Sequence, residues 1–233
     1  MLPAAPLQID RRPAALYFPV VTSLLLLLSL IAFSDNLFTD PGQPSNSDPK
    51  MVVHGLFAAA WVGLFALQAW LINLRRISAH RRIGRIGFIV GTGMALSTIY
   101  LFYARFRGFA AMSPEVMANR LLLPVFAVCF VLAWQRRNRP DWHKRLLLVG
   151  SMALLEPVLA RVYDPVLGWM LPPKLDPVLD MALFLSYLFG VWAALLGSLW
   201  FYDRAVLGRI HPVTWSASGA IASLNGLAYL IGA

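Results

Sequence analysis

The sequence predicts an all-α protein, a polytopic integral membrane bundle of seven transmembrane helices. Hydrophobic residues make up 59% of the 233-residue chain and charged residues only 13%, whereas soluble chains are roughly 45–50% apolar and about 25% charged. The apolar residues form seven runs, and basic residues gather in alternate loops between those runs. Because a membrane-crossing segment must satisfy its own backbone hydrogen bonds, we expect each run to be a helix.

The seven runs define the predicted spans. About 20 apolar residues cross a hydrocarbon core of about 30 Å, so most runs are long enough and the fifth is marginal. The first run, LYFPVVTSLLLLLSLIAF, is long for a signal peptide and no A-x-A site follows it, so we expect it to remain as an anchor. We expect a single transmembrane domain (1–233), with spans at approximately residues 14–33, 51–74, 84–103, 117–135, 146–162, 178–201 and 212–232.

The distribution of Lys and Arg predicts the orientation of the spans. Six of these 20 residues lie near the ends of the spans that face one side: Lys50, Arg105, Arg107, Arg120, Arg161 and Lys174. The other fourteen lie before the first run or in the loops after the second, fourth and sixth runs. Because basic loops stay in the cytoplasm, we expect a cytoplasmic N-terminus and an outer C-terminus. The net charge of +9 is then a topology signal, and no nucleic-acid partner is predicted.

Two basic stretches, RRISAHRRIGR (75–85) and RRNRPDWHKR (136–145), each carry one histidine and precede an apolar run. Their similarity suggests an internal duplication of spans. The simplest interpretation is anchoring, because each basic residue near an anionic leaflet contributes about 1 kcal/mol. The functional alternative is a headgroup-binding site where the stretches meet, formed by Arg75, Arg76, His80, Arg81, Arg82, Arg85, His143, Lys144 and Arg145. No histidine pair has a close ligand spacing, so no metal site is predicted.

Polar residues within the spans predict a second site. Glu156 lies 11 residues after Arg145, hence about 16 Å into the membrane at 1.5 Å per residue. A carboxylate at that depth must be protonated, paired or exposed to a water-filled cavity. Either Glu156 forms a structural pair, for instance with Arg120, or it binds a ligand or a proton. We expect a ligand-binding cavity in the outer half of the bundle, lined by His54, Arg120, Glu156, Arg161, Asp180, Tyr100, Tyr103 and Tyr187.

Small residues repeat every four positions in three of the spans. Such stripes let helix backbones approach closely in lipid. They predict contacts within the bundle, or a homo- or hetero-oligomeric interface, at Gly87, Gly91 and Ala95, at Gly190, Ala194 and Ser198, and at Ser218, Ala222 and Gly226. The single cysteine, Cys129, lies within an apolar run and forms no disulfide framework.

Several of these residues carry a resemblance to a known group. The stretch VVHGLFAAAWVGLFALQAWLI, then HRRIGR, HKRL and LEPVLARV, resembles uncharacterised bacterial multi-pass inner-membrane proteins with H…Q…HRxxGR…H[RK]R motifs. The resemblance covers residues 51–161 and implies a location in the bacterial inner membrane. It brings no activity with it. It marks as the family's polar positions His54, Gln68, His80, Arg82, Arg85, His143, Arg145 and Arg161.

The leading functional hypothesis is a non-catalytic or accessory membrane protein that binds membrane lipid or a lipophilic ligand, either alone or as a subunit of a larger membrane complex. One alternative is a quinone- or haem-linked oxidoreductase, although His54 is the only histidine in the outer half available to a haem there. Another is a small proton-coupled transporter that uses Glu156. Run 212–232 contains no lysine, which argues against a retinal protein. The sequence assigns no cofactor.

Overall fold

The computed structural model describes residues 11–167, 170–172 and 175–231, and every regular element among them is helical. The all-α prediction is therefore confirmed. The long helices are α1 (Arg11–Ala32), α3 (Pro49–Asn73), α4 (Ile77–Ala104), α5 (Pro114–Gln135), α6 (Pro140–Met152), α7 (Glu156–Val166), α8 (Pro177–Leu207) and α9 (Pro212–Ile231). Three short elements join them: η1 (Asp35–Thr39), α2 (Pro44–Ser47) and η2 (Phe109–Ala111).

Several helices are long and apolar enough to cross a membrane, which indicates a multi-pass membrane protein. By length and composition these are α1, α3, α4, α5 and α8. The helices α6 and α7 pass the same test as a pair, but they are bent by 58° at the break between them. The described residues therefore hold five candidate spans, or six with the bent pair, and α9 is not among them. The fifth predicted run, which is marginal in length, is the one that breaks.

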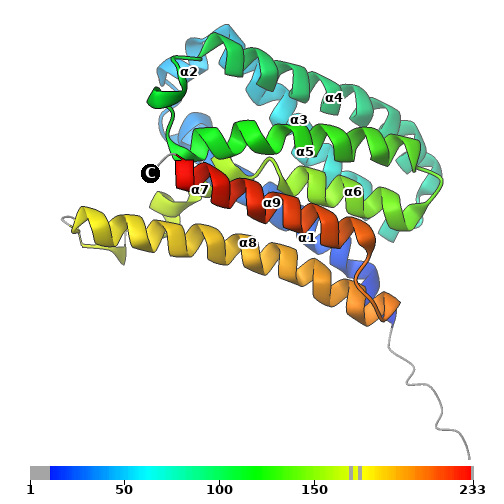
Figure 1. Cartoon of the computed structure of the whole chain (residues 1–233). Helices are drawn as coiled ribbons and strands as arrows, with labels where there is room; N and C mark the ends of the chain where they lie inside the picture. The colour runs from blue at the N-terminus through cyan, green and yellow to red at the C-terminus, as the bar shows by residue number, and fades with distance from the viewer. Residues whose placement is uncertain (1–10, 168–169, 173–174, 232–233) are drawn as a thin grey trace, which may run out of the picture.

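Figure 1 shows that consecutive long helices run in opposite directions, if α6 and α7 are taken as one bent segment. The start of α1 and the turns α3–α4, α5–α6 and α8–α9 lie at one end, on the right of the view, and we name this end the basic end. The opposite end carries η1, α2, η2 and the last described residues of α9. The basic end is named for the residues of its three turns: Arg75, Arg76, Arg136, Arg137, Arg139 and Arg209.

Local sequence signals explain where these helices begin and end. Proline stands first in α3, α5, α6, α8 and α9, a position where its missing N–H costs nothing and its φ suits the helix. The carboxylate of Asp176 caps α8 by accepting from the backbone N–H groups of Val178 and Leu179. Gly208 ends α8 in the left-handed conformation (φ 69°), which glycine adopts without a Cβ clash.

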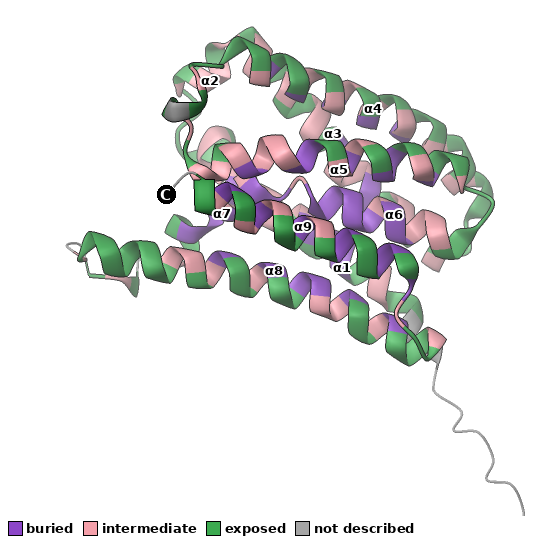
Figure 2. Ribbon diagram, viewed as in Figure 1, coloured by how far each residue is buried: buried purple, intermediate pink, exposed green. Residues whose placement is uncertain are grey.

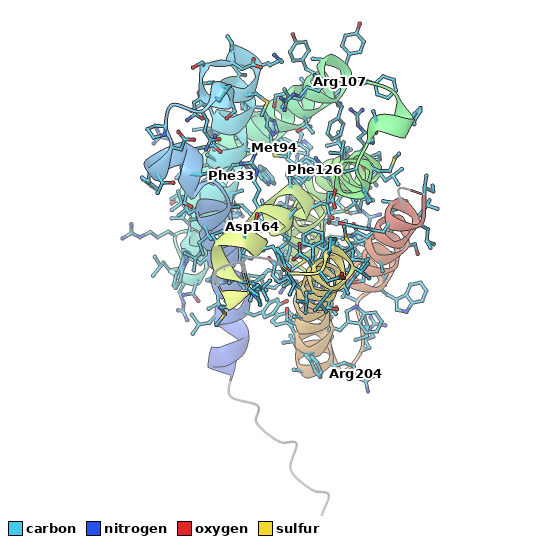
Figure 3. All side chains as sticks on the ribbon, turned by 90° about the vertical axis from the view of Figure 1, so that its left-hand side faces the viewer. Phe33, Met94, Arg107, Phe126, Asp164 and Arg204 are labelled. Atoms are coloured by element: carbon cyan, nitrogen blue, oxygen red, sulfur yellow. The ribbon has the colours of Figure 1, made fainter. Side chains whose placement is uncertain are left out.

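The core forms where α5, α6, α7 and α9 meet α1 and α8, and the buried positions in Figure 2 concentrate on these helices. A second, aromatic cluster lies between α3, α4 and α5 and contains Trp61, Met94, Phe126 and Phe130. In the end-on view of Figure 3, Met94 and Phe126 lie inside the bundle, whereas Arg107 and Arg204 lie at its edges. Large apolar side chains are exposed on every long helix except α6, as a lipid-facing surface requires.

The small-residue stripes have different surroundings. A Cβ on Gly91 would lie 2.6 Å from the ring of Phe130 and 2.7 Å from that of Trp61, so this glycine sits in a contact within the bundle. Ser218 is buried and accepts a hydrogen bond from Trp200 Nε1 at 3.1 Å. Gly190 and Ala194 are exposed, so two of the three members of the α8 stripe are open on the surface.

Candidate functional site

The structure does not bring the residues of the predicted outer-half cavity together at one place; they make separate contacts with neighbouring segments. The ring of His54 contacts Ser97 Oγ at 3.1 Å, which joins α3 to α4. Arg120 donates to the carbonyl oxygen of Phe102 at 2.7 Å and lies over the Phe102 ring, 4.7 Å from its centroid. Tyr103 is 82% exposed. Tyr100 is also exposed, so neither tyrosine lines an interior space.

The remaining predicted cavity residues form separate contacts near the end opposite the basic end. Arg161 donates to Asn36 Oδ1 at 3.1 Å and stacks over the ring of Phe33. Asp180 accepts from the hydroxyl of Tyr163, and Tyr187 donates to the carbonyl oxygen of Leu159, both at 3.1 Å. Each polar group is thus satisfied by a neighbouring helix, and these contacts hold the helices together.

Glu156 is fully buried and its environment is unlike that of the other residues predicted for the cavity. Its Oε1 accepts from the hydroxyl of Tyr229 at 2.9 Å, and its Oε2 accepts from Trp192 Nε1 at 3.2 Å. None of the ion pairs among the described residues includes Glu156. The predicted pair with Arg120 does not form. The carboxyl group therefore rests on two neutral donors, from α8 and α9.

The break between α6 and α7 places Glu156 at the first position of α7. Pro157 follows it and has no N–H, so the carbonyl of Ala153 loses the partner that a continuous helix would give it. Helix α6 ends instead in two turn hydrogen bonds that span three residues: Leu154 N–H donates to the carbonyl oxygen of Ser151, and Leu155 N–H donates to that of Met152. A carboxyl group in the first turn is also favoured by the helix dipole. The sequence L-E-P thus explains both the bend and the position of the acid.

Two buried polar atoms near this break have no partner among the described residues. They are Ser151 Oγ, on the last turn of α6, and Asn225 Oδ1, on α9. Asn225 is 2% exposed and lies one turn from Tyr229 on the same face of α9, because residues four apart are neighbours on a helix. Buried polar atoms are almost always hydrogen-bonded. Two other buried atoms, Trp61 Nε1 and Arg120 Nε, also lack a partner among the described residues, but both are nitrogens, so the two unpartnered oxygens are those near the break.

At the basic end, Arg145 is buried and cannot serve in the predicted headgroup-binding site. Its guanidinium donates to Asp203 Oδ1 at 2.7 Å from Nε and at 2.5 Å from a terminal nitrogen, and both side chains are 0% exposed. Asp203 Oδ2 accepts from Thr214 Oγ1 at 2.6 Å and from the backbone N–H of His211 at 2.9 Å. This charged network joins α6, α8 and the start of α9.

Lys144 and His211 lie at the edge of the same network. The ammonium of Lys144 contacts the hydroxyl of Tyr202 at 3.1 Å and lies 4.9 Å from the centroid of the Phe18 ring. His211 Nδ1 accepts from Val213 N–H at the start of α9. Burial lowers the pKa of His211, and the positive charge of Arg145 lowers it further. Both residues therefore hold helices together at this end.

The two basic stretches do meet, through His80 and His143. Their rings lie perpendicular with centroids 6.4 Å apart. His143 Nδ1 donates to the carbonyl oxygen of Ala133 at 2.9 Å, which leaves a lone pair on its Nε2. When the side-chain amide of Gln68 is oriented to satisfy both its nitrogen and its oxygen, the nitrogen donates to His80 Nδ1 at 2.5 Å and to the backbone carbonyl of His80 at 3.1 Å. The amide oxygen then accepts from the backbone N–H of Gly84 at 3.1 Å. The backbone carbonyl oxygen of Gln68 also lies 3.4 Å from His80 Nδ1, so both the side chain and the main chain of Gln68 contact this nitrogen.

The arginines of the first basic stretch remain exposed. None of the ion pairs among the described residues involves them: Arg75, Arg76, Arg81, Arg82 and Arg85. In the second stretch, the guanidinium of Arg136 stacks on Trp142, 4.9 Å from the ring centroid. Trp142 in turn lines an apolar groove of about 760 Å³ between α5, α6 and α9. An uncompensated cationic surface and an apolar groove thus meet at the basic end.

The described residues contain no group of three or more His, Cys, Asp or Glu side chains that could hold a metal ion. Sequence reasoning missed the residues that complete the buried sites, namely Asp203, Thr214, Trp192, Tyr229, Ser151 and Asn225. Asp203 carried a signal, since an acid among the aromatic residues WFYD at a span end requires a partner. No protein-family model, curated protein or solved structure matches the chain.

Proposed function

We propose that this protein is a non-catalytic, accessory multi-pass membrane protein that binds an anionic phospholipid at its basic end. The observation that carries the proposal is the groove between α5, α6 and α9, which is lined by Trp142, the residue on which the guanidinium of Arg136 stacks. An acyl chain lies in the groove, and the lipid phosphate contacts the guanidinium of Arg136. The bacterial inner membrane is the compartment that the H…Q…HRxxGR…H[RK]R resemblance implies.

The shape and lining of the groove support an acyl chain as its occupant. Its volume of about 760 Å³ lies within the range of roughly 300–1,000 Å³ that is typical of ligand pockets. Its walls are almost entirely apolar, and they include Val128, Leu132, Leu146 and Trp215. Val128 and Trp215 are 58% and 64% exposed, so the groove opens on the surface that faces lipid.

The charge around the groove supports an anionic headgroup. Arginine binds phosphate oxygens through a planar fork, and it stays charged at any physiological pH. The exposed arginines of the α3–α4 turn add positive charge at the same end, where each contributes about 1 kcal/mol of attraction to an anionic leaflet. Of the predicted headgroup residues, Arg145 and Lys144 are occupied within the protein, so the proposed phosphate contact moves to Arg136.

The proposed topology has seven crossings, with α6 and α7 forming one bent crossing and α9 the last. The basic end then faces the cytoplasm, because 14 of the 20 Lys and Arg residues belong to it by sequence. Seven crossings place the start of α1 and the end of α9 on opposite sides of the membrane, and in Figure 1 these two helix ends lie at opposite ends of the bundle.

The lipid proposal is tested by native mass spectrometry of detergent-purified protein with phosphatidylglycerol and phosphatidylcholine. Replacing Ala220 with Trp fills the groove, so we expect loss of both bound lipids. The Arg136→Gln variant keeps the groove, so we expect the preference for phosphatidylglycerol to fall about fivefold, the equivalent of about 1 kcal/mol.

Two matched controls accompany these variants. Ala60→Trp adds the same side chain at an exposed position of α3 outside the groove. Arg137→Gln removes a neighbouring arginine that stacks on Trp134 and does not reach the groove. Both controls should bind lipid like the unaltered protein. An Ala220→Trp protein that kept its lipids would contradict the proposal.

A further inference from the structure

None of the positively charged side chains that the structure describes forms an ion pair with the buried carboxyl group of Glu156. An ionised carboxylate deep in an apolar core costs several kcal/mol unless a positive charge accompanies it. The charged or titratable side chains on α7 and on the helices around its break include Glu115 and Arg120 on α5, Asp180 and Tyr187 on α8, Tyr229 on α9, and Arg161 and Tyr163 on α7 itself. Of these, only Tyr229 contacts Glu156, and it is neutral.

The oxygens near the break all have lone pairs that could coordinate a cation. Ser151 Oγ and Asn225 Oδ1 are buried without a hydrogen-bond partner among the described residues. The carbonyl oxygen of Ala153 has no helical donor, because the residue four positions later is Pro157, which has no N–H. In membrane proteins, broken helices whose backbone carbonyls and carboxylates face the interior are where small cations bind. The break between α6 and α7 has this composition.

We propose that Glu156, together with Asn225 and Ser151, forms an exchangeable binding site for one small monovalent cation, a proton or a sodium ion, at the break between α6 and α7. A proton neutralises the carboxylate by forming an O–H bond on one of its oxygens, whereas a sodium ion is held by the carboxylate and the neutral oxygens together. Tyr229 and Trp192 hold the carboxylate from the other side. The site lies within the core cluster that α5 to α9 share, apart from the lipid groove, so neither proposal depends on the other.

Infrared difference spectroscopy of the full-length protein in lipid vesicles tests the site directly. A pH step that loads and unloads the proton should produce the C=O band of a buried protonated carboxylic acid. We expect this band in the unaltered protein and its loss in Glu156→Gln. The chain has only two glutamates, so Glu115→Gln is the matched control and should keep the band.

Repeating the titration with sodium chloride or choline chloride identifies the cation. If sodium competes, the midpoint pH of the band falls with rising sodium, by up to one pH unit for each tenfold increase. An unchanged midpoint assigns the site to the proton alone. The Asn225→Leu variant should shift the midpoint in either case. A spectrum identical in the unaltered protein and Glu156→Gln overturns the proposal.

A second readout is available if Glu156→Gln folds poorly. Trp192 donates to Glu156, so its fluorescence should change with the same midpoint as the infrared band. Subtracting the signal of Trp192→Phe isolates it from the other seven tryptophans. If the Trp192 fluorescence stays constant over the whole pH range in which the site should gain and lose its proton, this result also counts against an exchangeable site.

Discussion

At the scale of single residues, Arg145 shows how a tertiary contact changes the role of a charge. In the sequence, Arg145 belongs to the basic stretch HKRL, which predicts contact with lipid headgroups. In the fold it turns inward, because helix α6 starts only five residues earlier and Arg145 lies on its buried face. Asp203 supplies the opposite charge, and Thr214 and the His211 N–H satisfy the second carboxylate oxygen. The pair is complete, and little of it is available to a lipid.

The first prediction concerns this pair. Removing one partner leaves a buried charge uncompensated, so Arg145→Met or Asp203→Leu alone should lower the free energy of unfolding by about 3–5 kcal/mol. The double variant removes both charges and should be less destabilised than either single variant. Unfolding in mixed detergent and denaturant measures this. Arg137→Met is the control, and equal losses in single and double variants would contradict the pairing.

At the scale of helices, the break between α6 and α7 decides which side chains Glu156 contacts. A straight helix over residues 140–166 would place Glu156 on one continuous face, as the sequence pattern assumes. Pro157 and the tight turn before it bend the axis by 58° instead. The carboxyl group then reaches α8 and α9, and it does not reach the arginines of α5 and α7. A local signal therefore predicts the kink, but the partners follow from the direction of the bend.

Helix α4 gives the element-scale prediction. Its Gly91 faces the rings of Trp61 and Phe130, so Gly91→Ala forces those rings or the helix to shift. Overpacking of this kind costs about 1–3 kcal/mol. Gly190→Ala, with nothing within 4 Å, should instead be neutral or stabilising by roughly 0.5–1 kcal/mol. Thermal unfolding of both variants makes the comparison, and equal effects would show that α3, α4 and α5 do not pack as described.

At the scale of the whole molecule, the proposed orientation yields a labelling prediction. The single cysteine, Cys129, is buried and can be replaced by Ala to give a background without thiols. In cells, Ser45→Cys on α2 should react with a membrane-impermeant maleimide, whereas Asn138→Cys in the α5–α6 turn should react only after the membrane is opened. Labelling of both positions from outside would contradict the topology and, with it, the cytoplasmic placement of the proposed lipid site.

The sequence by itself determined that the long helices are apolar enough to lie in a membrane, that the fold is all-helical, and where the long helices approximately begin and end. Runs 51–74 and 117–135 reappear as 49–73 and 114–135, because the apolar length that crosses a bilayer and the helix that satisfies its backbone are local properties. Only the tertiary structure decided which polar groups meet. The partners of Glu156 and Arg145 depend on how each helix is rotated and bent against its neighbours, and packing between distant segments sets that rotation. This is why the residues of the predicted outer cavity do not meet at one place, while two buried polar sites arose elsewhere.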